Sequence, residues 1–265
     1  MGSNGAAGSG WRLEAEMKAT PHCRVVEVTA EDEPQQLRQF TIEDLGSDDY
    51  ARKRYIGRVQ LSGLQDKGQK HQAVIILDWD DTILATSYLS STGFTELTPD
   101  GAEQFRALDA QALRLLEKVI GFGTVFIVTN AASGWVQYSS RMYLPGVHEL
   151  LNARGVQVIS ARSEFEEAHP GDYHRWKEEA FKKVGEQFPR EPITNLVCIG
   201  DSNIEIDAAH TLSKQFSEPL VKTIKFKEHP KPEELVKQQQ LVVARFEDIY
   251  LSMKAMTIRL ERKSS

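Results

Sequence analysis

The chain has 265 residues, of which 40% are hydrophobic, so it is long and apolar enough to bury one large core. Its net charge at pH 7 is -6, and the lysines and arginines are scattered among acidic residues. A chain without a basic stripe is not expected to bind nucleic acid. No apolar run approaches the roughly 20 residues of a membrane-spanning helix, so no membrane partner is expected either.

The chain contains two cysteines, Cys23 and Cys198. This sparse usage is typical of a reduced compartment and offers no disulfide framework. The first residues lack the charged and then apolar layout of a secretion signal. We therefore expect a cytoplasmic protein, with the nucleus as the alternative location.

Composition and pattern divide the chain into four regions. Residues 1–20 are rich in Gly, Ser and Ala and are expected to form a flexible tail. Residues 21–72 are expected to form an N-terminal arm, with a short strand at 23–28, that packs on the core. The core follows at 73–226. A C-terminal helical extension occupies 227–265, with a helix from Pro232 to about Met253 and an edge strand at 257–260.

Continuous apolar runs alternate with helical patterns throughout the core. Runs at 74–77, 125–128, 156–160, 193–199 and 220–226 predict buried strands. Apolar residues at spacings of three and four predict helices after Thr98, over 134–154 with a break at Pro145, over 172–188 and over 203–214. Strands that alternate with helices in this way predict a doubly wound, parallel α/β sheet.

Polar residues follow three of these strands at the point where each strand ends. Asp78 and Asp80 follow the first, Thr129 ends the second, and Asp201 follows the fourth. In such sheets ligands bind at the carboxyl ends of the strands, where helix N-termini also offer donors to an anion. Two carboxylates in one small volume hold a cation, share a proton, or divide nucleophile and acid–base roles. An acidic turn is the alternative for Asp78 and Asp80 alone, but three converging strands favour a functional site.

These residues resemble the motifs of the haloacid dehalogenase-like hydrolase superfamily, most of whose members are phosphatases. The Asp-x-Asp-x-Thr motif is matched by Asp78–Thr82, the strand that ends in Thr or Ser by Thr129, and Gly-Asp with a second acid by Gly200–Glu205. The remaining motif is a lysine on the preceding helix, for which Lys177, Lys182 and Lys183 are candidates. Lys177 is favoured because it lies nearest the edge where the strands end. The resemblance covers roughly residues 73–226.

The resemblance implies a role for each matched residue. Asp78 is the nucleophile that forms an aspartyl-phosphate, and Asp80 is the general acid and base. Thr129 hydrogen-bonds a phosphoryl oxygen, and Lys177 supplies a fixed positive charge.

A magnesium ion is implied as the cofactor. It would be held by Asp78, the main-chain carbonyl of Asp80, and Asp201, with Glu205 touching the ion or its waters and Asp207 as a rival for that role. Thr82 and Asn130 are the expected substrate-binding residues, with Thr82 acting chiefly through the turn that aims Asp80. Trp79 is expected to serve packing.

The motif spacing leaves no room for a large cap domain. The resemblance is therefore to capless members, whose open sites accept phosphorylated proteins or other large substrates. The segment 83–100 is expected to be a loop whose Tyr88 and Phe94 either contact substrate or anchor the loop in the core. Trp135, just after the second motif, is expected to pack its helix, with the alternative that Trp135 or Arg141 lines the entrance to the site.

The leading interpretation is a magnesium-dependent phosphatase that hydrolyses phosphate monoesters on a small molecule or a protein. A phosphate-binding or scaffolding protein without turnover is the alternative from another class. A phosphomutase is a further alternative, disfavoured because its intermediate needs a cap to exclude water.

Overall fold

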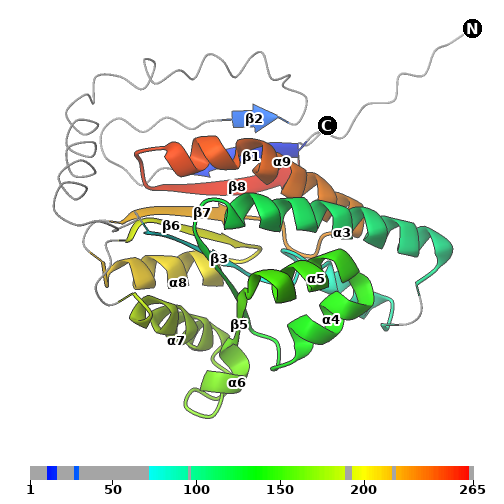
Figure 1. The fold of residues 1–265 in the computed structure, drawn as a ribbon, viewed down its shortest axis with the longest axis horizontal. Coiled ribbons are helices and arrows are strands. Elements are labelled where there is room, and N and C mark those ends of the chain that lie inside the picture. The colour runs from blue at the N-terminus through cyan, green and yellow to red at the C-terminus, as the bar shows by residue number, and fades with distance from the viewer. Residues whose placement is uncertain are drawn as a thin grey trace, which may run out of the picture.

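The structure, a computed structural model, describes residues 11–16, 27–29, 72–94, 97–188, 193–216 and 219–262. In this part of the chain, eight strands form one sheet in the order β2-β1-β8-β7-β6-β3-β4-β5 (Figure 1). The strands from β8 to β5 are parallel, and β1 and β2 extend one edge in antiparallel pairing. This confirms the predicted doubly wound α/β sheet.

The elements have the following bounds. The strands are β1 (Trp11–Glu16), β2 (Glu27–Thr29), β3 (Gln72–Leu77), β4 (Thr124–Thr129), β5 (Gln157–Ser160), β6 (Ile193–Gly200), β7 (Leu220–Lys225) and β8 (Met256–Arg262). The helices are α2 (Thr86–Ser91), α3 (Pro99–Ile120), α4 (Trp135–Tyr143), α5 (Pro145–Arg154), α6 (Ala161–Phe165), α7 (Tyr173–Glu186), α8 (Asn203–Ser213) and α9 (Pro232–Leu251).

Strand β3 is central and is buried on both faces, as its unbroken apolar sequence predicts. Ile75 and Leu77 join the core beneath α3 and α9, whereas Val74 and Ile76 join the core beneath α7 and α8. Figure 1 shows these helix pairs on opposite sides of the sheet. Helices cover both faces of β3 with apolar side chains. Polar side chains therefore gather at the carboxyl end of this strand.

The chain reverses its direction of travel across the sheet at β3. From β3 it passes to β4 and β5 on one side, and it then returns to β6, β7 and β8 on the other. A ligand site in an open α/β sheet lies where the strand order reverses. This point is the carboxyl end of β3, between β4 and β6.

The sheet edge differs from the prediction in two places. Residues 1–20 were expected to be a flexible tail, but Trp11–Glu16 form β1, whose register pairs Trp11 with Arg262 and Glu16 with Thr257. The segment 257–260 was expected to be an edge strand, but β8 lies inside the sheet between β7 and β1. Both errors have one cause. The pairing of β1 with β8 joins opposite ends of the chain, and local sequence pattern does not reveal it.

Two smaller differences from the prediction are short helices. The segment 83–100 contains α2, and α6 follows β5 directly; both are too short for a periodic apolar pattern to reveal them. Of the N-terminal arm, only β2 and the start of β3 fall within the described residues, so the expected strand at 23–28 is described only from Glu27 onward.

The segments between the motif strands contribute to the layers around the sheet. Residues between β3 and β4 form α2 and α3, and those between β4 and β6 form α4 to α7 with β5. Within the described ranges, no segment builds a separate cap, as the spacing predicts. None of the helices in those ranges has the length and apolar composition needed to cross a membrane.

Lys222 on β7 is a fully buried cation outside the strand-end region. Its Nζ donates a hydrogen bond to Asn195 Oδ1 at 2.6 Å and another to the main-chain oxygen of Tyr250, at the end of α9. Its Nζ also lies 5.6 Å from the centroid of the Tyr250 ring. Burial lowers the pKa of Lys222 to about 7.

This pKa predicts how the free energy of unfolding varies with pH. Between about pH 7 and 10.5 the unfolded lysine holds a proton that the folded one has lost, so stability should rise with pH across this window. The slope from this group is at most about 1.4 kcal/mol per pH unit. Lys222→Met should flatten the pH dependence measured by urea unfolding.

A surface variant, Lys182→Met, removes one lysine charge without touching the core and should keep the wild-type slope. Equal slopes for wild type and Lys222→Met would show that Lys222 is not responsible.

Candidate active site

Three neighbouring strands deliver polar residues to one edge of the sheet. Asp78 follows β3, Thr129 is the last residue of β4, and Asp201 follows β6. The main-chain nitrogen of Asp78 donates a 2.9 Å hydrogen bond to the oxygen of Ile199, which extends the β3–β6 pairing by one step. The sheet itself therefore fixes the position of Asp78.

A buried ion cluster joins β3, α7 and α8. Lys177 on α7 donates to Asp78 Oδ1 and lies 3.0 Å from Glu205 Oε1, and the Lys177 side chain is only 1% exposed. Buried charges are tolerated when they are paired, and here one ammonium is shared by two carboxylates. The structure thus brings Lys177 to Asp78, as its position on the helix favours.

The other two lysine candidates lie at the surface. Lys182 pairs with Glu179, and Lys183 pairs with Glu164. Neither contacts Asp78.

Glu205 has both of its oxygens engaged. Oε1 faces Lys177, and Oε2 accepts hydrogen bonds from the nitrogen and the hydroxyl of Ser202, at 3.1 and 2.5 Å, in a capping box at the start of α8. The Ser-x-x-Glu spacing in the sequence is the signature of this box. The family resemblance assigned Glu205 to the metal site alone. Asp207, the rival acid, is exposed on α8.

Gly200 allows Glu205 to reach the cluster. A Cβ at position 200 would lie 2.5 Å from the Cγ of Glu205 and 2.8 Å from its Cβ, closer than carbon atoms pack. The glycine of the Gly-Asp pair is therefore required by the close approach of α8 to β6.

Asp80 is held by three donors from three different elements. Oδ1 accepts from the Thr86 hydroxyl at 2.7 Å and from the Trp135 indole nitrogen at 2.8 Å, and Oδ2 accepts from the Thr129 hydroxyl at 2.8 Å. The Thr129 hydroxyl donates to Asp80 in this structure, and its expected hydrogen bond to a phosphoryl oxygen stays a prediction. Helix packing was the favoured role for Trp135 and the site entrance its alternative. The hydrogen bonds of Trp135 and Thr86 to Asp80 were not foreseen, because both depend on the fold of α2 and α4 around Asp80.

Thr82 lies beneath the site. It is fully buried, and its hydroxyl oxygen has no hydrogen-bond partner among the described residues. Gln239 of α9 donates to the main-chain oxygens of Thr82 and Ile83, at 2.9 and 3.3 Å. This placement fits a support for the turn after Asp80 and argues against direct substrate contact by Thr82.

Asn130 and Trp79 connect the site to the scaffold. Asn130 Nδ2 donates to the main-chain oxygen of Tyr173 at 3.3 Å, which ties the end of β4 to the first turn of the helix that carries Lys177. The Trp79 ring is fully buried, and its indole nitrogen donates to Ser139 Oγ at 3.0 Å. Trp79 therefore packs, as its place between the two acids suggested.

The cluster carries more negative charge than its lysine balances. Burial, opposed by Lys177 but reinforced by Glu205 and Asp201, raises the pKa of Asp78 well above its usual range. Burial and the nearby carboxylates of Glu205 and Asp81 raise the pKa of Asp201 to about 7. Burial disfavours the charge of Lys177, yet Asp78 and Glu205 outweigh it and raise its pKa.

This surplus of carboxylate charge suits a divalent cation. Asp201 forms no ion pair within the described residues. Mg²⁺ takes one or two carboxylates and completes its octahedron with other oxygens and waters. Asp78 and Asp201 are two carboxylates close enough for their charges to interact, although the described residues contain no group of three or more His, Cys, Asp or Glu side chains that could hold a metal.

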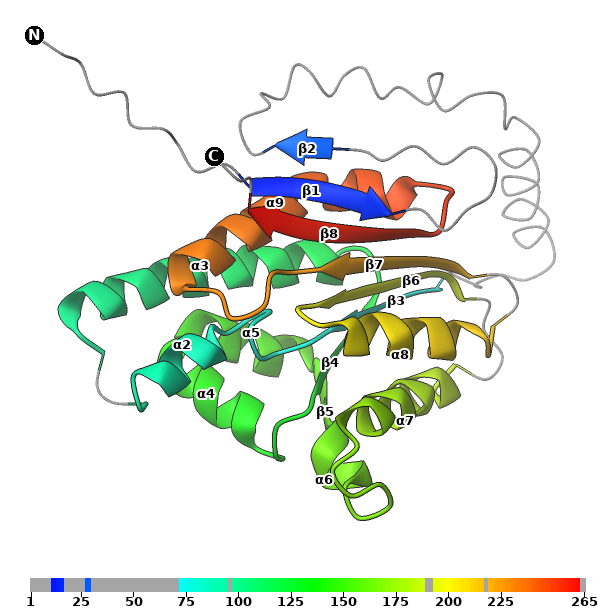
Figure 2. The same cartoon turned by 180° about the vertical axis from the view of Figure 1, so that it is seen from behind.

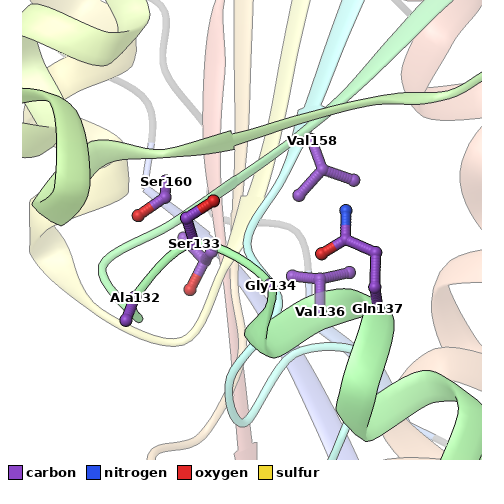
Figure 3. A pocket seen from close by; sticks show the side chains of 8 residues that line it. Ala132, Ser133, Gly134, Val136, Gln137, Val158 and Ser160 are labelled. Carbon is purple, nitrogen blue, oxygen red and sulfur yellow. The ribbon is translucent and has the colours of Figure 1, made fainter.

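A small, largely polar pocket adjoins the site at the ends of β4 and β5 and the start of α4 (Figure 3). Its cavity volume is about 30 Å³, and it is partly open to solvent. Its lining consists of Thr129, Ala132, Ser133, Gly134, Val136, Gln137, Val158 and Ser160. Thr129 is shared with the hydrogen bonds around Asp80, so this pocket and the acidic cluster are neighbours.

Comparisons with protein-family models, with curated proteins and with solved structures found no match for this chain. Residue chemistry and geometry therefore carry the functional proposal.

The contact between Gly200 and Glu205 predicts the effect of adding one methyl group. Gly200→Ala should displace Glu205 from Lys177 and lower the free energy of unfolding by roughly 1–3 kcal/mol, the usual cost of overpacking. Urea unfolding measures this loss.

Gly121→Ala is the matched control, because the nearest atom to its added Cβ would be 3.3 Å away. A Gly200→Ala protein as stable as this control would mean that α8 can move away from β6 without cost.

Proposed function

We propose that this protein is a phosphatase of the haloacid dehalogenase-like type, which hydrolyses phosphate monoesters through an aspartyl-phosphate on Asp78. The observation that carries the proposal is the contact of Asp78 with the buried Lys177 at the carboxyl end of the central strand. A second carboxylate, Asp80, is oriented two residues away, which provides the acid–base group that such a reaction needs.

Asp78 acts as the nucleophile. Lys177 holds Oδ1, so Oδ2 is the oxygen that attacks phosphorus. The bond between phosphorus and the leaving oxygen breaks, and its electron pair stays on the leaving oxygen. The fixed charge of Lys177 offsets the repulsion between the carboxylate and the phosphate, which is the main obstacle to this step.

Asp80 moves the protons. Its carboxyl group gives a proton to the leaving oxygen in the first step. In the second step its carboxylate takes a proton from the water that attacks phosphorus, and the bond between phosphorus and Asp78 breaks to restore the carboxylate. The hydrogen bonds from Thr86, Thr129 and Trp135 keep Asp80 in one orientation for both steps.

Mg²⁺ is the proposed cofactor, held by Asp78, the main-chain carbonyl of Asp80, and Asp201. When bound it supplies positive charge that reduces repulsion between carboxylates and phosphate. Because both oxygens of Glu205 are engaged, we assign Glu205 to the positioning of Lys177 in place of direct metal contact.

Release of phosphate from an aryl phosphate tests the nucleophile. Purified protein should hydrolyse 4-nitrophenyl phosphate with Mg²⁺, and Asp78→Asn, which keeps the shape of the side chain, should lower kcat by about 10³-fold or more. Omission of Mg²⁺ should reduce the rate in the same assay.

Asp207→Asn provides a carboxylate control on the exposed face of α8 and should keep wild-type activity. Wild-type turnover no higher than that of Asp78→Asn, on this ester and on phosphopeptides, would instead favour a phosphate-binding or scaffolding protein.

Thermal unfolding of Asp201→Asn tests the metal site. The folded pKa of Asp201 lies above its value in the unfolded chain, so the folded protein loses stability as pH rises from about 4 to 7. At pH 8 without Mg²⁺ the variant should have the higher Tm, by roughly 2–4 °C for each 1 kcal/mol regained. Mg²⁺ should raise the Tm of the wild type and leave that of the variant unchanged.

An equal Mg²⁺ response in both proteins would remove Asp201 from the proposed set of ligands. Asp207→Asn again serves as the matched loss of one acidic charge.

A further inference from the structure

An exposed group of aromatic side chains lies beside Asp80. Trp135 donates its indole hydrogen to Asp80, and its ring contacts Phe94 edge-on at 5.9 Å between centroids and Tyr138 at 6.2 Å. Phe94 follows α2, and Trp135 and Tyr138 lie one turn apart on α4. Figure 2 shows α2 and α4 at the same end of the molecule. We call Phe94, Trp135 and Tyr138 the aromatic rim.

The outer members of the rim contact Trp135 but leave much of their rings open to solvent. Phe94 is 46% exposed and Tyr138 is 58% exposed. Tyr88, the other aromatic residue of the same segment, packs against Phe105 at 6.2 Å and is the anchor of the segment in the core. Of the two uses that the sequence left open for this segment, anchoring in the core is the one that Tyr88 serves.

The backbone of Phe94 supports a role outside folding. Its φ is 54°, in the left-handed region that aromatic residues rarely adopt. Strained, exposed residues of this kind gather at ligand-binding sites, where the strain is tolerated for the sake of function. Asn or Gly would adopt this φ at lower energy, so an aromatic side chain at this position is not explained by the turn alone.

We propose that the aromatic rim binds the leaving group, and that the preferred substrates are aryl phosphate monoesters, the phosphotyrosine side chain among them. This inference rests on the proposed phosphatase function. Asp80 protonates the leaving oxygen, and Trp135 contacts Asp80, so the group attached to that oxygen lies against the rim. A polyol would find no charged partner among these three rings, whereas an aromatic ring packs on them edge-on or offset.

Aryl esters are more reactive than alkyl esters, so the comparison must be made between variants and not between substrates. Tyr138→Ser removes one ring of the rim, and Phe94→Asn removes another with a residue that suits a positive φ. Each substitution should raise KM for a phosphotyrosine peptide roughly three- to tenfold, which corresponds to the usual binding free energy of one aromatic contact. Neither should change KM for the matching phosphoserine peptide.

Leu251→Ser serves as the control for loss of an exposed apolar side chain. Leu251 is 63% exposed at the end of α9, away from the rim, and the variant should match the wild type on both peptides. Equal effects of Tyr138→Ser and Phe94→Asn on the two peptides, or none on either, would overturn the inference.

Binding of two non-hydrolysable phosphonates separates this inference from the proposed reaction. By calorimetry with Mg²⁺, the wild type should bind phenylphosphonate roughly three- to tenfold more tightly than methylphosphonate, and Tyr138→Ser should lose that preference. A preference without Asp78-dependent turnover would support the rim and overturn the proposed hydrolysis. Turnover with equal affinity for both phosphonates would overturn the rim alone.

Discussion

Lys177 is buried between Asp78 and Glu205, and at this depth its charge is maintained by both carboxylates together. Loss of Lys177 would leave two buried carboxylates without their cation, and an uncompensated buried charge typically costs about 3–5 kcal/mol. The ion cluster therefore holds β3, α7 and α8 in one relative position. It also aims one oxygen of Asp78 by occupying the other, so the same contact serves the fold and the proposed chemistry.

The two acids of the proposed reaction are held by different means. Asp78 is fixed by an ion pair, whereas Asp80 is fixed by neutral donors on α2, β4 and α4. A nucleophile benefits from a nearby cation that also faces the phosphate. A group that gives a proton in one step and takes one in the next benefits from partners that hold it in one orientation for both steps.

The sequence reveals the features that depend on local pattern. Apolar runs that stop at polar residues locate Asp78, Thr129 and Asp201 at the strand ends, and helix position favours Lys177 over the two lysines that follow it. Parallel strands make this possible, because their carboxyl ends must share one edge.

Contacts made by distant, chemically ordinary residues are not visible in the sequence. Thr86 and Trp135 reach Asp80 only because α2 and α4 fold around it. Strand β1 exists through its pairing with β8, and a composition rich in small residues nearby gave no sign of that partner. Gly200 belongs to a recognised motif, yet its steric reason is seen only where α8 meets β6.

The wide separation of the cluster along the chain has a consequence for its synthesis. Asp78 meets Lys177 across 99 residues, and Glu205 follows later still on α8. Since chains emerge from the ribosome N-terminal first, a nascent chain that ends before α8 contains Asp78 and Lys177 but lacks Glu205. The site is thus assembled only when most of the sheet has been made, and truncated translation products lack it.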